Sequence, residues 1–212
     1  ALDGVLRAVG MRLSSTPQRA LLGVLFGQVR LGLRGYAWVE RDVTEVSAAE
    51  LRKIDVCWSV VTGLGIVDNV RAREFAEKQT LLALKAGERY RIARALACEV
   101  TSSAVEGSRA VERTARLARL TREVAERSGH PFARGFEQLA GGLSAYLEGR
   151  FRDCLETCEA AGRVLRDECV GATWERGNAN LFSLWALAQL GDFAENVRRL
   201  PGLTADARAR GD

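Results

Sequence analysis

Glycine recurs every 42 positions through most of this 212-residue chain. A fixed period of this length is typical of stacked helical repeats, because each repeat is one helix pair that buries its apolar side against its neighbours. The period constrains the fold more than any other feature of the sequence, and it predicts an all-α chain. There are two interleaved glycine series: Gly65, Gly107, Gly149 and Gly191, and then Gly87, Gly129 and Gly171. An aromatic residue follows each member of the second series by three positions: Tyr90, Phe132 and Trp174.

Apolar residues at helical spacing, separated by cap and turn residues, predict the individual helices. Ser47, with Glu50 three positions later, has the pattern of a capping box, and Asp68 and Ser108 are expected to cap two further helices. Pro17 suits the first turn of an earlier helix. The apolar residues of that earlier helix are Leu21, Leu22, Leu25, Val29 and Leu33. The expected helices cover residues 2–13, 17–35, 47–63, 68–86, 88–106, 109–128, 131–148, 150–169 and 172–190, and a last one begins at Asp192 and should end at Pro201.

These helices predict a right-handed α-solenoid of antiparallel helix pairs, tetratricopeptide-like, with a 42-residue period. We expect three parts. Residues 1–46 form an N-terminal helical hairpin and an irregular connector, since 36–46 break the helical period; residues 47–200 form the repeat array; residues 201–212 form a tail. The three periodic aromatic residues should be buried between successive pairs.

The charge balance is mild: 31 basic and 27 acidic residues give a net charge of +4. That is too little to favour a nucleic-acid partner. No run of 18 or more apolar residues occurs, so no membrane span is expected. The five cysteines are an odd count within apolar helical patterns, which indicates reduced thiols. We therefore expect a cytoplasmic protein with neither nucleic acid nor membrane as partner.

No pattern for a metal, cofactor or catalytic site stands out. Cys154 and Cys158 lie one helical turn apart, but the single histidine, His130, precedes a proline at a turn, and a closed zinc site takes about four ligands. We interpret the thiols as packing residues and His130 as a surface or capping residue. The stretch from Gly63 to Asp68 lacks the third glycine and the preceding strand of a dinucleotide loop. We expect no cofactor, no metal, and no catalytic residue in this segment.

Two columns of the repeat change chemistry while keeping their position, as a ligand-binding surface would. Neutral surface variation is the alternative. A separate arginine-rich helix, 109–128, could offer an anion-binding face, although a solvated face with Arg–Glu pairs three or four apart explains it as well. The first column is Arg94, Phe136 and Asn178 and the second is Leu96, Gln138 and Asn180, so the candidate groove comprises Arg94, Phe136, Asn178, Gln138 and Asn180.

Two resemblances add to these patterns. Gly149-Arg-Phe151, with Cys154, Cys158 and Ala161 downstream, resembles the second helix of a tetratricopeptide repeat, although that family's period is about 34. The stretches 54–68, 84–97, 147–152, 165–175 and 184–187 resemble the C-terminal helical region of large bacterial serine/threonine protein kinases. The kinase resemblance implies a parent signalling kinase in which this chain is a sensor or docking region, and it transfers no active-site residue.

Two functions remain open at this point. The first is a protein-interaction or regulatory module that binds a protein or another domain of the parent chain. The second is a small-molecule effector sensor of the kind found in signal-responsive ATPases and transcription regulators. A deep pocket would favour the sensor, and an open groove or a large apolar patch would favour the docking module. The side chains expected to line a sensor pocket are Trp174, Trp185, Phe136 and Tyr146.

Overall fold

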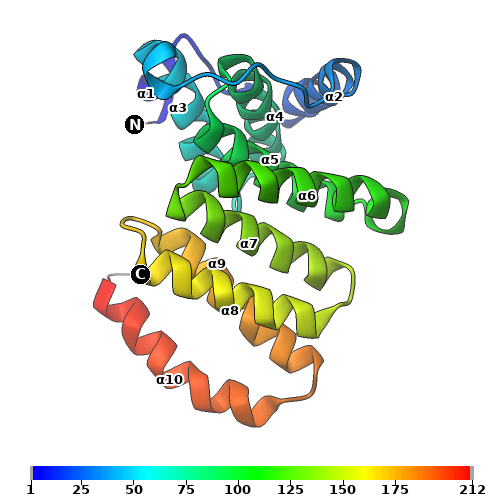
Figure 1. Cartoon of the computed structure of the whole chain (residues 1–212), viewed down its shortest axis with the longest axis vertical. Coiled ribbons are helices and arrows are strands. Elements are labelled where there is room, and N and C mark those ends of the chain that lie inside the picture. The colour runs from blue at the N-terminus through cyan, green and yellow to red at the C-terminus, as the bar shows by residue number, and fades with distance from the viewer. Residues whose placement is uncertain (1, 211–212) are drawn as a thin grey trace. The chain divides into compact units, whose positions relative to one another are not determined.

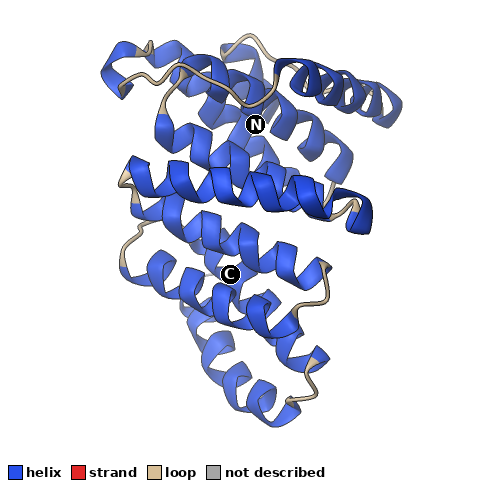
Figure 2. Ribbon diagram, turned by 45° about the vertical axis from the view of Figure 1, so that its right-hand side comes forward, coloured by secondary structure: helices blue, strands red, loops and turns tan. Residues whose placement is uncertain are grey.

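The computed structural model describes residues 2–210. These residues form ten α-helices and two short 3₁₀ helices, and none of them forms a β-strand (Figure 2). The predicted all-α class is confirmed. Extended pairing within this range is limited to an isolated bridge between Arg41 and Glu88. None of the described helices is both long and apolar enough to cross a lipid bilayer. The elements are α1 Leu2–Ala8, α2 Pro17–Arg34, η1 Val43–Glu45, α3 Ala48–Leu64, α4 Asn69–Ala86, α5 Arg89–Ala104, η2 Gly107–Ala110, α6 Val111–Ser128, α7 Pro131–Leu147, α8 Phe151–Asp167, α9 Thr173–Gln189 and α10 Phe193–Arg210.

The chain divides into two compact units between Ala95 and Leu96, inside α5. In the first unit, α4 packs against both α2 and α3, and α1 packs against α3 (Figure 1). Apolar side chains from α1, α3 and α4 form one core there, and Met11 and Leu13 pack against it from the segment after α1. The buried members of this core are Leu6, Val56, Cys57, Val60 and Phe75.

In the second unit each helix lies beside the next one along the chain, from α6 to α10, and α7 also contacts α9 (Figure 1). The axes of α7 and α8 come close because Gly142 has no side chain: a Cβ there would collide with the Sγ of Cys158. Cys154 and Cys158 are both fully buried in this contact. The small residues of this pair thus serve close helix packing, as the sequence predicted for the two cysteines.

Several predicted helix starts are confirmed by the cap geometry. The Ser47 hydroxyl accepts from the Glu50 amide at 3.3 Å, and carboxylates of Asp68 and Asp192 cap α4 and α10 in the same way. Pro17 occupies the first turn of α2. His130 is a capping residue, since its Nδ1 accepts from the amide of residue 132 at 3.2 Å.

Three local predictions were wrong. Ser108 does not cap a helix, because it lies inside η2, and α6 begins three residues later without a side-chain cap. The first helix ends at Ala8 instead of continuing to residue 13. Pro201 does not end the last helix, so residues 201–210 are helical and not a tail. An ion pair at 3.2 Å between Arg176 of α9 and Asp206 holds the part of α10 beyond the proline.

The two glycine series mark turns at most of their positions. Gly87 and Gly129 follow α4 and α6 directly in the left-handed conformation, which glycine adopts without steric cost. Gly171 lies in the loop beyond the end of α8, and Gly65 has an ordinary right-handed φ of −55°. Six of the seven periodic glycines share a positive φ of 65° to 82°, and Gly65 is the exception.

Candidate functional site

The face of α2 that packs on α4 is apolar and includes glycine and alanine. Ala20, Val24, Gly27 and Leu31 are buried there. A Cβ on Gly27 would lie 2.8 Å from the Cβ of Glu77, closer than side chains tolerate. This glycine therefore lets α2 approach α4 directly, and it leaves the large apolar residues of α2 on the other side of the helix.

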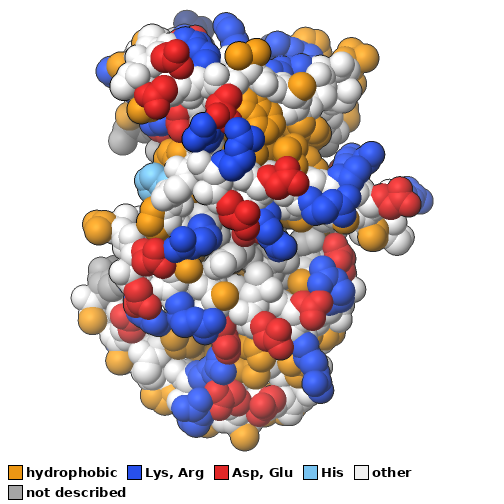
Figure 3. All heavy atoms as spheres, viewed as in Figure 1, with side chains coloured by type: hydrophobic (Ala, Val, Ile, Leu, Met, Phe, Trp, Pro, Cys, Tyr) orange, Lys and Arg blue, Asp and Glu red, His pale blue; other side chains and the backbone are white. Residues whose placement is uncertain are grey.

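That other side carries an apolar surface that is largely exposed to solvent. At 3.6 residues per turn its six large side chains fall within an arc of about 140°. They range from 50% to 86% exposed, and together they amount to roughly 600 Å², the upper end of the largest apolar patch on a typical monomer. In the space-filling view, apolar and basic side chains are both visible over α2 (Figure 3). This α2 stripe consists of Leu21, Leu22, Leu25, Phe26, Val29 and Leu33.

All the charge on α2 is positive. Its sequence contains Arg19, Arg30 and Arg34 and no aspartate or glutamate. At helical spacing the three arginines follow one edge of the stripe, between it and the buried face. A binding surface with an apolar centre and a basic edge results.

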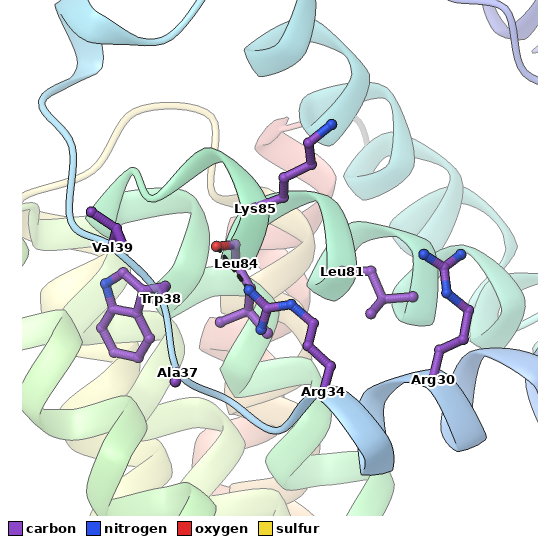
Figure 4. A pocket seen from close by; sticks show the side chains of 8 residues that line it. All are labelled: Arg30, Arg34, Ala37, Trp38, Val39, Leu81, Leu84 and Lys85. Carbon is purple, nitrogen blue, oxygen red and sulfur yellow. Dashed lines mark hydrogen bonds between the residues drawn. The ribbon is translucent and has the colours of Figure 1, made fainter.

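A groove of about 530 Å³ adjoins that basic edge, between α2, α4 and the connector that follows α2. Leu81 and Leu84 form its apolar side, while Arg30, Arg34 and Lys85 stand around it (Figure 4). The groove is open to solvent. This basic groove is lined by Arg30, Arg34, Ala37, Trp38, Val39, Leu81, Leu84 and Lys85.

The three cations of the basic groove are held differently. Arg34 donates to the carbonyl oxygens of Gly35 at 3.0 Å and Leu84 at 3.2 Å, which fixes its guanidinium across the groove (Figure 4). Arg30 lies over the Phe26 ring, 5.6 Å from its centroid. Lys85 forms no ion pair within residues 2–210. Arg30 and Lys85 are thus available to an anionic group, and neither has to give up a carboxylate to meet it.

The groove combines apolar and cationic groups. Its eight lining residues include no carboxylate, histidine, hydroxyl or thiol, and its one amine belongs to Lys85. They do offer an apolar floor, an indole and three cations. A partner that combines apolar and anionic groups fits such a site.

Arg94 is not accessible as the binding anchor that the sequence predicted. It is only 5% exposed, and its Nη2 donates to Asp55 Oδ1 at 2.6 Å. Its guanidinium carbon lies 5.1 Å from the centroid of the Trp58 ring and 5.3 Å from that of Tyr90. Asp55 also accepts two hydrogen bonds from Arg91. Arg94 therefore stabilises the first unit from within.

The other four predicted groove residues lie on α7 and α9 of the second unit, two neighbouring helices. Phe136 is buried at 6% exposure and stacks on Phe132, with ring centroids 5.9 Å apart. Asn178 donates within its own helix to the Trp174 carbonyl at 2.8 Å. Gln138 and Asn180 are half-buried. Arg94 thus belongs to the first unit and the other four residues to the second, and the two expected anchors, Arg94 and Phe136, are both buried.

Asn180 does line a hollow of about 410 Å³ between α8, α9 and α10. Arginines dominate its wall, but most of them are paired: Arg176 with Asp206, and Arg199 with Glu159 at 2.5 Å. Arg163 forms no ion pair among the described residues. The hollow could therefore take a small anion, although the helix-to-helix ion pairs already explain most of its charge.

Two of the four aromatic residues considered for a sensor pocket, Tyr146 and Trp185, pack in one cluster with Phe182. The Tyr146 ring lies 5.9 Å from Trp185 and 5.4 Å from Phe182, centroid to centroid. Trp174 is half-buried, and so are Tyr90 and Phe132, which the sequence predicted to be largely buried. None of these rings lines the basic groove or the α8–α10 hollow.

The cysteines have the surroundings of packing residues. Burial raises the pKa of the Cys57 thiol to about 12, so it stays protonated. The Sγ atoms of Cys154 and Cys158 lie 3.9 Å apart, and both residues are buried. Within residues 2–210 no three histidine, cysteine or acidic side chains are grouped as metal ligands would be.

Sequence reasoning missed the α2 stripe and the basic groove. Two signals were available: a helix with three arginines and no acidic residue, and a tryptophan, Trp38, within an irregular connector. Neither signal says which side of α2 faces solvent. No protein-family model matches the chain, and searches of curated proteins and of solved structures found no similar protein.

Proposed function

We propose that this chain is a non-catalytic protein-interaction module that binds the apolar face of a helix from a protein partner or from another domain of its parent chain. The observation that carries this proposal is the α2 stripe beside the basic groove. Exposed apolar patches of this size mark interaction sites on soluble proteins. Stripe and groove together approach the roughly 800 Å² that each partner contributes to a standard interface.

The finer architecture belongs to the same proposal. The helices form a right-handed, tetratricopeptide-like solenoid with a 42-residue period, and the chain is a cytoplasmic regulatory segment of a bacterial serine/threonine protein kinase. Helix pairs of nearly constant length and glycines at most of the periodic turns support the repeat. Only the sequence resemblance supports a kinase as the parent protein. Superposing the helix pairs α4–α5, α6–α7 and α8–α9 tests whether they are structural repeats.

A displayed library of amphipathic helical peptides tests the docking function. Selected peptides are titrated by fluorescence anisotropy against the chain and against Leu25→Ser/Phe26→Ser, which makes the middle of the stripe polar. We expect that double substitution to weaken binding at least tenfold, because central aromatic and aliphatic anchors dominate such interfaces. Both residues are at least half exposed, so the fold should survive.

The matched control is Val105→Ser/Val170→Ser, which makes the same kind of change at two exposed positions outside the stripe. It should bind the peptides as the unaltered chain does. Equal weakening in both variants, or full binding by the stripe variant, would contradict docking through α2. Turnover of ATP or of a phosphoester by the purified chain would contradict the non-catalytic assignment.

A second candidate function is effector binding in the α8–α10 hollow. It is supported by the unpaired Arg163 and by Asn180, both on the hollow's wall. A thermal-shift screen of small phosphates and carboxylates tests it: a genuine effector raises the melting temperature of the chain and fails to do so in Arg163→Ala. No shift with any of these anions would remove this candidate.

A further inference from the structure

We infer that the partner segment is an acidic amphipathic helix, whose apolar side chains cover the α2 stripe and whose carboxylates face Arg30 and Lys85 at the basic groove. This inference rests on the docking function proposed above and specifies its partner. It follows from the one-sided charge of the surface, from the two cations without carboxylate partners, and from the shape of the groove.

The charge of the surface selects an anionic partner. Three arginines lie along one edge of the stripe, α2 has no acidic residue, and Lys85 adds a fourth cation across the groove. A partner with basic edges would meet like charges at close range, which disfavours binding. An acidic edge instead gains charge-assisted hydrogen bonds without breaking existing ion pairs of Arg30 or Lys85.

The groove gives this partner a place for a side chain. Leu84 is buried at the groove's floor, and Leu81 and Trp38 are half-buried beside it. An apolar side chain that projects from a helix can enter such a recess, which is the helix-in-groove mode of recognition. A bilayer surface would cover the stripe but leave the recess unfilled, so the shape favours a peptide over a membrane.

A second copy of this chain is a poorer occupant. Its own α2 stripe is apolar enough, but that helix carries no carboxylate to meet the arginines of the first copy. Self-association through α2 would bury the leucines and leave the basic edges unmatched. The acidic helix satisfies both parts of the surface at once.

The test uses peptides of about 18 residues, the length of α2, with fixed leucines on one face and flanking positions randomised among Glu, Gln and Lys. We expect selection on the immobilised chain to enrich Glu at the flanks. Arg30→Glu/Lys85→Glu should weaken the selected peptides at least tenfold, and high salt should weaken them similarly, because exposed charges are screened. The matched control, Arg116→Glu/Arg119→Glu on the exposed face of α6, changes the net charge equally and should bind normally.

The outcomes separate this inference from the docking function. Peptides that depend on Leu25 and Phe26 but show no preference for Glu would overturn the acidic partner and leave docking intact. If the selection yields no peptide whose binding depends on the stripe, both the acidic partner and the docking function are overturned. Two further measurements can overturn the inference: stripe-dependent binding to phosphatidylglycerol vesicles without peptide binding would indicate a membrane, and stripe-dependent dimerisation by analytical ultracentrifugation would indicate a second copy.

Discussion

Helices α2 and α6 each span 18 residues, and they present opposite chemistry to solvent. The exposed side of α6 carries arginines and glutamates, and its inward side carries Leu117 and Val124. The exposed side of α2 carries leucines, a valine and a phenylalanine, and its inward side carries Ala20, Val24, Gly27 and Leu31. Both sides of α2 are therefore apolar, and the side with the glycine and alanine faces inward.

The neighbour in the first unit is α4, which places Glu74 and Glu77 beneath α2. Glu74 is buried, and its Oε1 accepts a hydrogen bond from Ser14 at 3.0 Å and pairs with Lys78 at 2.7 Å. Turning α2 by half a turn would press leucines onto two buried carboxylates, which is costly. Gly23 and Gly27 lie over these glutamates, and the α2 stripe faces solvent.

The arginine-rich outer face of α6 is a solvated face with ion pairs, and two of these pairs reach beyond the helix. Arg113 pairs with Glu106, and Arg122 pairs with Glu137 of α7 at 3.3 Å. These pairs connect α6 to its neighbours, whereas the sequence suggested pairs three or four residues apart along α6. In contrast, Arg30 of α2 has no acidic partner in the described chain.

The largest expected effect contrasts a buried leucine of α6 with an exposed one of α2. Leu117→Ala should lower the free energy of unfolding by about 2–5 kcal/mol, because it leaves a cavity in the second unit. Leu22→Ala should change it by less than about 0.5 kcal/mol, since that side chain is already in water. Urea denaturation followed by circular dichroism measures both, and similar losses would break the comparison.

A smaller effect tests the glycine contact beneath α2. Gly27→Ala should destabilise the chain by about 1–3 kcal/mol, because the new Cβ meets the Cβ of Glu77 and the two helices must separate. Gly32→Ala on the same helix has nothing within 4 Å and should stabilise by up to about 1 kcal/mol through helix propensity. Thermal denaturation compares the two, and a gain in both variants would show that α2 does not approach α4 this closely.

A third effect depends on pH. Burial raises the pKa of Glu137, while Arg122 favours its charged form. Because the folded-state pKa exceeds the unfolded one, ionising Glu137 costs stability as pH rises through that pKa, and Arg122 limits this cost. Arg122→Ala should lose roughly 0.5–1 kcal/mol at pH 7, a loss that shrinks as acidification protonates Glu137. Arg30→Ala leaves no carboxylate without its partner. The denaturation midpoint of this variant should therefore change with pH as that of the unaltered chain does between pH 7 and pH 4.

The smallest effect on stability should accompany a clear change in dye binding. Leu25→Ser/Phe26→Ser should leave the free energy of unfolding within about 0.5 kcal/mol of the unaltered chain. It should also reduce the fluorescence of the apolar dye ANS about twofold, because the stripe is the chain's main exposed apolar surface on a single helix. An arginine-to-serine change at Arg116 and Arg119 of α6 should leave the dye signal unchanged.

Much of the secondary structure could be predicted from local signals. The caps at Ser47, Asp68, Asp192 and His130 act within a few residues, and the expected helices of the periodic part agree with the structure to within a few residues. The candidate site could not be predicted in this way. Arg94 looked like a surface anchor because its partner Asp55 lies 39 residues away in sequence.

The sequence by itself determined that the chain is helical and where most of its helices begin and end, because period, caps and turn glycines are short-range properties. Tertiary structure alone decided which side of α2 faces solvent, that Arg94 is buried between two rings, and that α10 continues beyond Pro201. Each of these depends on a partner distant in the chain: Glu74 and Glu77 beneath α2, Asp55 beside Arg94, and Arg176 against Asp206. A helical pattern shows that a helix has an apolar side, and only the neighbouring helix settles whether that side is buried.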